Sequence, residues 1–138
     1  MAEVLLKGRE VPLLYTVCEM RDIQKEIGPI SQAIPAILGR NPDDDKDMSR
    51  FGGADHIEAV AKMIRILGNA GLEEAGESTY LTDKFVMRAL KPSDMVTMIN
   101  AGMEAMNEGM ASEIPPKDSD EPVDVTLEEM NKKKEKEN

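Results

Sequence analysis

The chain has 138 residues and a mass of 15.2 kDa, the size of one compact domain that can bury a core without disulfides. Its 27 acidic and 17 basic residues give a net charge of -10, which argues against a protein that binds the phosphate backbone of nucleic acids. A single cysteine, no apolar run near the roughly 20 residues of a membrane span and no secretory signal pattern together favour a cytoplasmic protein without a membrane segment.

Two short apolar segments near the N-terminus predict a β-hairpin. The first strand is expected over residues 3–7 and the second over residues 11–17, and Gly8 between them can adopt the positive φ of a tight turn. Pro12 has no N–H to donate, so its part of the second strand should be an edge. Because a two-stranded hairpin is marginal by itself, it must pack against the rest of the domain.

The hydrophobic period then changes from that of a strand to that of a helix. Met20, Ile23 and Ile27 stand at i, i+3 and i+7 among charged residues, which predicts an amphipathic helix. Thr16 is a candidate N-cap with Glu19 at the capping-box position. The helix is expected to end at the Gly-Pro pair of residues 28 and 29.

A second short helix and a long loop follow. The helix is expected over residues 30–38, where Pro35 either kinks or restarts it. Residues 39–54 carry loop signals, and loops of this length in small domains are usually functional or mobile. Asp43, Asp45 and Asp47 have the alternate spacing that begins a calcium loop, but the expected Gly and Glu positions hold Met48 and Ala54. We therefore expect a solvated loop and no metal site.

A longer helix is predicted next, with Asp55 as its N-cap and Glu58 at the box position. It should fray near Gly68 or Gly71. The expected core stripe of this helix consists of Ile57, Val60, Ile64 and Leu67. Thr82 then opens another short helix that runs to about residue 90.

The sequence contains no recognisable catalytic set. His56 has no second histidine with which to share a metal, so a partly exposed structural role is expected. Cys18 follows a strand within an apolar stretch, which predicts a buried and inert thiol. No acid–base pair, metal-ligand set or phosphate loop is evident, so we expect a protein that is not an enzyme and has no cofactor.

The last helix, expected to begin after Pro92, carries a methionine-rich face. The residues on this face are Met95, Met98, Ile99, Gly102, Met103, Met106 and Met110. Two interpretations are open: a core stripe, or an adaptable surface for another chain, since methionine re-packs against partners of differing shape. Both interpretations hold if one part of this face points inward and its far end, Met103 to Met110, points outward. The candidate partner-binding residues are Met95, Met98, Ile99, Met103 and Met106.

The predicted architecture is a mainly α (α+β) domain over residues 1–110, with an N-terminal β-hairpin followed by a small helical bundle. Residues 111–138 contain three prolines and mixed charge with little to bury, which predicts a disordered tail. The chain has almost no aromatic residues with which to fill its core, so a neighbouring subunit can supply part of the packing. A homo-oligomer is therefore expected.

The chain resembles the tail assembly chaperones of long-tailed bacteriophages and prophages. The resemblance rests on the hairpin of residues 4–17, with its aromatic–Thr pair running into a charged helix closed by Gly28, and on two later segments. These are Asn69-Ala70-Gly71-Leu72 at the end of a helix and Leu90-Lys91-Pro92-Ser93-Asp94 at the start of the last one. Together they cover about residues 3–110.

The resemblance implies a non-enzymatic protein of the host cytoplasm that binds and solubilises the tape measure protein during tail assembly. The tail tube protein is a further implied partner, and the chaperone is absent from the finished virion. Two other classes stay open: a structural virion component, such as a head–tail connector or tail tube protein, and an acidic nucleic-acid mimic that inhibits a host enzyme.

Overall fold

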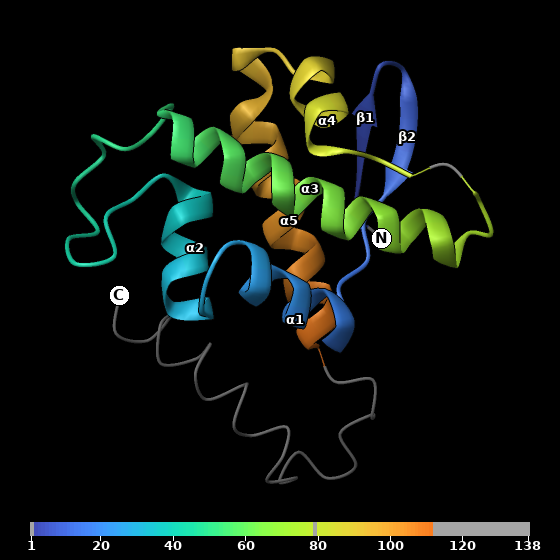
Figure 1. The fold of residues 1–138 in the computed structure, drawn as a ribbon, viewed down its shortest axis with the longest axis horizontal. Coiled ribbons are helices and arrows are strands. Elements are labelled where there is room, and N and C mark those ends of the chain that lie inside the picture. The colour runs from blue at the N-terminus through green and yellow to red at the C-terminus, as the bar shows by residue number, and fades with distance from the viewer. Residues whose placement is uncertain (1, 79, 112–138) are drawn as a thin grey trace, which may run out of the picture.

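The computed structural model describes residues 2–78 and 80–111 and has the predicted architecture, an N-terminal hairpin followed by a small helical bundle (Figure 1). In chain order the elements are β1 (Glu3–Leu6), β2 (Arg9–Pro12), α1 (Val17–Glu26), α2 (Ile30–Leu38), α3 (Ala54–Glu74), α4 (Asp83–Ala89), the 3-10 turn η1 (Pro92–Asp94) and α5 (Met95–Met110). The predicted disordered tail, apart from its first residue, lies outside the described residues.

The two antiparallel strands are joined by a two-residue turn in which both Lys7 and Gly8 have positive φ, the geometry that matches the twist of a hairpin. β2 ends at Pro12, so the prediction of a strand extending to residue 17 was wrong. Beyond Pro12 the N–H of Leu13 still donates to the carbonyl of Ala2, just before β1, at 2.9 Å, and the N–H of Leu14 donates to the carbonyl of Leu67 in α3 at 3.1 Å. The chain therefore leaves the hairpin at Leu14, where α3 supplies the acceptor.

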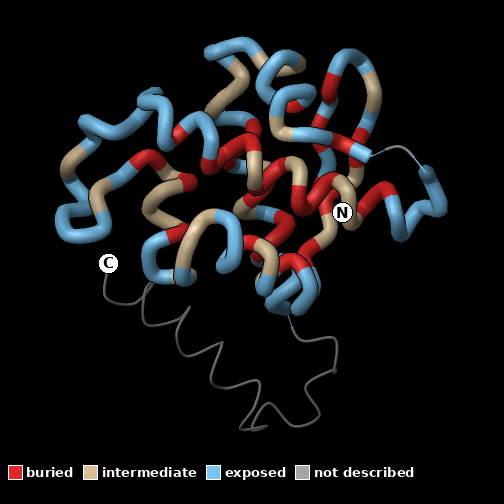
Figure 2. Tube along the Cα trace, in the orientation of Figure 1, coloured by how far each residue is buried: buried red, intermediate tan, exposed pale blue. Residues whose placement is uncertain are grey.

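Helix α3 crosses the centre of the domain and packs against α1, α2, α4, α5 and β2 (Figure 1). Figure 2 shows that buried backbone positions run along most of its length, whereas the loops around it are exposed. Val60, Ile64 and Leu67 are buried as predicted. Ile57 is 37% exposed, so its assignment to the core was wrong: His56 and Ala59 take the inward positions in the first turns of α3.

The predicted ends of α3 were also wrong. The N-cap is Gly53, with no side-chain cap, and Asp55 lies inside the first turn. The helix runs through Gly68 and Gly71 to Glu74. A Cβ built on Gly71 would lie 1.9 Å from the carbonyl oxygen of Pro12, so this glycine allows helix and hairpin to approach closely and does not end the helix.

Helix α1 confirms the predicted capping box at its start, where the N–H of Thr16 donates to the Glu19 carboxylate at 2.8 Å. The predicted burial of Cys18 was wrong, because its side chain is exposed. Ile23 defines the inward face of α1, and Cys18, five residues earlier, is rotated from it by about 140° around the helix axis.

The long loop of residues 39–53 is fastened to α3 through His56, which is 2% exposed and therefore more buried than predicted. The N–H of Gly52 donates to His56 Nδ1 at 2.9 Å, and this bond requires Nδ1 to be unprotonated. The proton is then on Nε2, which donates to the carbonyl of Ile37 at 2.9 Å. The ring of Phe51 packs on the imidazole with centroids 4.6 Å apart.

Replacing His56 with Phe is expected to lower the free energy of unfolding by about 2 kcal/mol, because an aromatic ring is kept while the Gly52 N–H and the Ile37 carbonyl lose their partner. Chemical denaturation followed by circular dichroism measures this loss. Phe51→Leu, which removes only the ring contact, should cost about 1 kcal/mol or less. Equal losses in the two variants would contradict the role assigned to the imidazole nitrogens.

Candidate protein-binding surface

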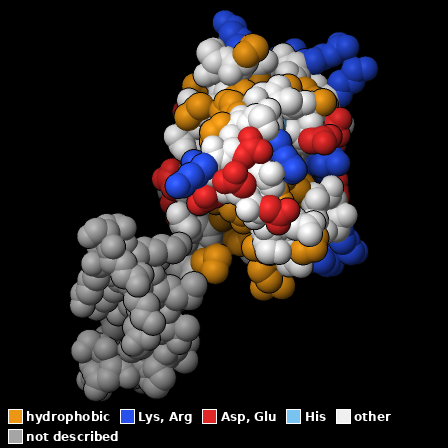
Figure 3. Space-filling model, turned by 90° about the vertical axis from the view of Figure 1, so that its left-hand side faces the viewer, with side chains coloured by type: hydrophobic (Ala, Val, Ile, Leu, Met, Phe, Trp, Pro, Cys, Tyr) orange, Lys and Arg blue, Asp and Glu red, His pale blue; other side chains and the backbone are white. Residues whose placement is uncertain are grey.

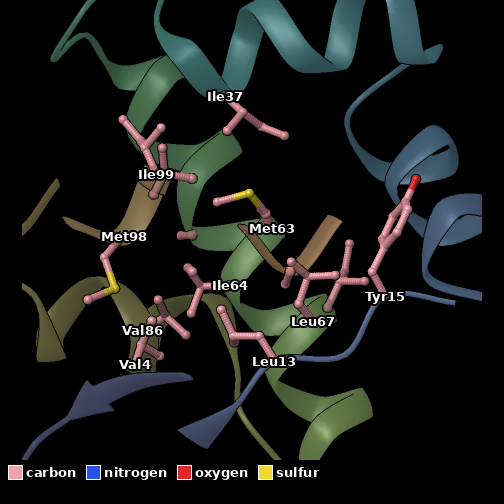
Figure 4. Close-up of a cluster of buried hydrophobic side chains, with 14 of the residues drawn as sticks. Val4, Leu13, Tyr15, Ile37, Met63, Ile64, Leu67, Val86, Met98 and Ile99 are labelled. Carbon is pink, nitrogen blue, oxygen red and sulfur yellow. The ribbon is translucent and has the colours of Figure 1, made fainter. Parts of the chain in front are cut away.

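The methionine face of α5 divides into a buried and an exposed part. Met98, Ile99 and Met106 are 4%, 6% and 4% exposed, so for these three the core interpretation is confirmed. In Figure 4, Met98 points toward Val86 of α4, and Ile99 lies beside Met63 of α3. The condition under which both interpretations hold, an outward-facing end from Met103 to Met110, is met only in part, because Met106 lies in the core.

The accessible part of α5 is a narrow edge beside the buried stripe. Met95 and Met103 are half-buried, while Val96 and Met110 are more than half exposed. Val96, Met103 and Met110 follow one another at intervals of seven residues, which places them in one line along the helix. Of the candidate binding residues, only Met95 and Met103 are therefore available to a partner at the surface of the described fold.

The C-terminal end of α5 lies against the segment that leads into α1. A Cβ built on Gly109 would lie 2.2 Å from the carbonyl oxygen of Tyr15, so the two backbones are in close contact. Met110 and Val17 therefore belong to the same end of the molecule. Val17 is 77% exposed, the largest exposed fraction among the large hydrophobic side chains of the described residues.

Helix α1 carries a shallow hollow next to this contact. Its volume is about 300 Å³, and it is lined by Val17, Met20, Arg21, Gln24 and Lys25. Only Val17 and Met20 contribute large apolar side chains to the hollow. Its rim is polar, which is the arrangement of a small protein-binding surface with an apolar centre.

Further half-buried aliphatic side chains from α1 and α2 pack on the same core and remain partly open to solvent. We use the name apolar end surface for the following set: Val17, Met20, Ile27, Ile30, Ile34, Met103 and Met110. In Figure 1 the helices that carry them, α1, α2 and the C-terminal half of α5, lie in the lower part of the domain. Figure 3 shows hydrophobic side chains at the lower end of the face drawn there, and others across its upper part.

Tyr15 is a buried side chain next to this surface. Its ring is buried against the end of α5, and burial, assisted by the negative charge of Glu19, raises the pKa of its phenol above the ordinary value of 10.0. Because this pKa is higher in the folded than in the unfolded state, the contribution of the neutral Tyr15 phenol to the free energy of unfolding is fully present below pH 10. That contribution is lost as the pH rises through the folded-state pKa.

The chain has two tyrosines and no tryptophan, so ultraviolet absorbance can follow Tyr15 alone in a Tyr80→Phe variant. In that variant the phenolate should form with a midpoint above pH 10.0, together with loss of helical circular dichroism. Tyr15→Phe removes this phenol and should extend the folded range to higher pH. Phenolate formation below pH 10.0 in the Tyr80→Phe variant, with the fold intact, would contradict the burial described.

Arg65 of α3 forms ion pairs with residues of two other helices. Its guanidinium pairs with Glu26 at the end of α1 and with Asp83 at the start of α4. Burial lowers the pKa of Arg65, but the hydrogen bonds that its guanidinium donates to the two carboxylates and their negative charges outweigh burial, so the net pKa of Arg65 is raised from its ordinary value. Arg65 thereby fixes the positions of two helices that the sequence alone does not bring together.

A second hollow of about 580 Å³ lies between α2, the long loop and the start of α3. Its lining mixes cationic Arg40, Arg50 and Lys62 with acidic Asp55 and Glu58. Among residues 2–78 and 80–111, no three His, Cys, Asp or Glu side chains lie close enough to hold a metal ion. The buried side-chain nitrogen and oxygen atoms of these residues all have hydrogen-bond partners, so no buried, unsatisfied side-chain group points into the hollow.

Sequence reasoning found the helix that borders the apolar end surface, but three of the five residues that it selected on this helix are buried in the core: Met98, Ile99 and Met106. The line from Val96 to Met110 was readable as a seven-residue spacing, but which face of α5 meets α3 depends on the packing of Gly102 against Met63. Val17 was read as the end of a strand, so its exposure was missed.

No helix within the described residues is long and apolar enough to cross a membrane. Comparison of the chain with protein-family models, with curated proteins and with solved structures finds no match.

Proposed function

We propose that the chain is a tail assembly chaperone of a long-tailed phage or prophage. In this role it binds and solubilises the tape measure protein in the host cytoplasm, performs no catalysis and does not remain in the finished virion. The proposal rests on the resemblance of residues 3–110 to that family. The observation that carries it in the fold is the apolar end surface, which the described residues leave partly uncovered.

The chemistry of this surface suits a long helical partner. Methionine and isoleucine side chains at the edge of the core can re-pack against successive apolar stretches of different shape. The net charge of -10 keeps a loaded complex soluble by mutual repulsion. The mechanism is therefore reversible covering of apolar surface, with no bond made or broken.

The test is co-expression with the tape measure protein encoded by the same phage, followed by co-purification and light scattering. We expect that protein to be soluble only with the wild-type chain, and a Met103→Glu/Met110→Glu double variant to reduce its soluble yield about tenfold or more. Such a loss corresponds to about 1.4 kcal/mol of binding free energy, the scale of one interface anchor.

Met87→Glu is the matched control, because Met87 is also partly exposed but lies on α4, outside the apolar end surface. It should leave the soluble yield unchanged, and circular dichroism should show all variants folded. The proposal fails if the tape measure protein stays insoluble with the wild-type chain. It also fails if the chain is found in purified particles, which is the result expected of a virion component.

The same light-scattering data give the number of chains in the free and loaded states. We expect more than one copy in the complex, because a helical partner longer than one domain offers several equivalent apolar stretches.

A further inference from the structure

The end of the domain that carries α4 is cationic, in contrast to the acidic chain as a whole. Lys84 and Arg88 stand four residues apart on the solvent side of α4, since the intervening Val86 is the buried residue of that helix. Lys7 of the hairpin turn lies over the ring of Phe85, 5.6 Å from its centroid. We call Lys7, Lys84, Phe85 and Arg88 the cationic patch; Figure 3 shows Lys and Arg side chains at the upper end of the molecule.

Two acidic side chains, one at the start of α4 and one in the segment before it, are engaged elsewhere. Asp83 pairs with Arg65, and Glu77 pairs with Arg9. Within residues 2–78 and 80–111, the side chains of Lys7, Lys84 and Arg88 form no ion pair. Phe85 is 38% exposed between them. The patch thus offers three positive charges without ion pairs on the hairpin turn and α4, together with one partly exposed aromatic ring, which suits a segment that is acidic and apolar at once.

The chain itself contains such a segment. Residues 118–129 include no Lys or Arg, and their charged residues are Asp118, Asp120, Glu121, Asp124, Glu128 and Glu129. Three aliphatic residues, Val123, Val125 and Leu127, alternate within it. No stretch of similar length among the described residues combines this charge with this apolar content.

The connection is long enough to join the two. The chain leaves α5 at Ala111, at the opposite end of the domain from α4, and the 16 residues of α5 span about 24 Å. The thirteen residues that follow Ala111, up to Asp124, reach up to about 43 Å when extended. A tether of this length holds the segment at an effective concentration in the millimolar range, which makes a weak contact significant.

We propose that residues 118–129 dock on the cationic patch of the same chain, with carboxylates on Lys7, Lys84 and Arg88 and aliphatic side chains on Phe85. This inference is independent of the proposed function, because it concerns the opposite end of the domain from the apolar end surface. It assigns a role to the most acidic part of the sequence and to the one exposed aromatic side chain of α4.

The test is zero-length coupling of carboxylates to amines with a carbodiimide in the full-length chain, followed by mass spectrometry. Amide bonds should join Lys7 or Lys84 to acidic residues of 118–129, and Lys46 in the exposed loop should give none. Arg88→Glu is the informative variant, because arginine does not react with the reagent, so a lower yield at Lys7 and Lys84 reports lost docking. We expect a decrease of about fivefold, with a similar decrease in 1 M salt.

Arg40→Glu is the matched control, since Arg40 is exposed at the opposite side of the domain, and it should change the yield less than twofold. Equal coupling to all lysines, or no effect of Arg88→Glu, overturns the proposal. Coupling that appears only between chains, in covalent dimers that increase with protein concentration, overturns docking within one chain.

Discussion

A single carboxylate at Met98 is expected to unfold the domain, whereas the same change at Met103 is expected to leave it folded. Met98 is 4% exposed and points toward Val86 of α4, in a cluster that offers no partner for a charge. Burying an unpaired carboxylate there should cost about 4 kcal/mol or more, which approaches the whole stability of a small domain. Met103 is half-buried, and its Glu variant can extend into solvent.

Thermal and urea unfolding followed by circular dichroism distinguish the two variants. Met98→Leu serves as the control for shape and should lower the free energy of unfolding by less than about 1.5 kcal/mol. A cooperative transition of Met98→Glu at the wild-type temperature would show that this face of α5 is not packed in the core. The result also decides which residues are usable in binding experiments, because a Met98 charge variant would fail in those for lack of folding alone.

Replacing Gly71 with Ala is expected to lower the free energy of unfolding by about 3 kcal/mol, although alanine is the better helix former by about 1 kcal/mol. The added methyl group would lie 1.9 Å from the Pro12 carbonyl oxygen and 2.5 Å from its carbon. These are backbone atoms, so α3 and the hairpin must separate. That movement also breaks the bond between the Leu14 N–H and the Leu67 carbonyl.

Gly102→Ala is the matched comparison, because Gly102 also lies inside a helix and faces a close contact. There the nearest atoms belong to the flexible side chain of Met63, which can change rotamer. We expect a loss of about 1 kcal/mol or less for Gly102→Ala. If urea unfolding gives both variants the same loss, the contact at Pro12 is not the rigid one described.

The features that were predictable from the sequence are those set by neighbouring residues. The turn at Lys7-Gly8, the capping box of Thr16 and Glu19 and the bounds of α2 each depend on a few consecutive side chains. Pro35 proved compatible with α2, which runs unbroken from residue 30 to residue 38. Local signals were therefore sufficient to give the fold class and most of the helices.

The features that were missed depend on contacts between distant segments. Gly68 and Gly71 carry the local signal of a helix end, but both face the hairpin, where a side chain would collide with Leu81, Val11 or Pro12. The exposure of Cys18 depends on which face of α1 packs against the core, and that face is the one that carries Ile23. The hydrophobic periodicity of the sequence alone does not reveal this. The division of the methionine face is of the same kind, because it follows from the packing of Gly102 in α5 against Met63 in α3.

The segment from Pro12 to Tyr15 has a further consequence for how the domain is made. It contacts Gly71 of α3 and Gly109 of α5, so this segment is synthesised well before the helix α5 that covers it. Ribosomes add about 5–20 residues per second, so Tyr15 is exposed for about 5–20 s before its partner is translated. During that time the nascent hairpin and the N-terminus of α1 lack their covering helix, which makes early capture by a ribosome-associated folding factor advantageous.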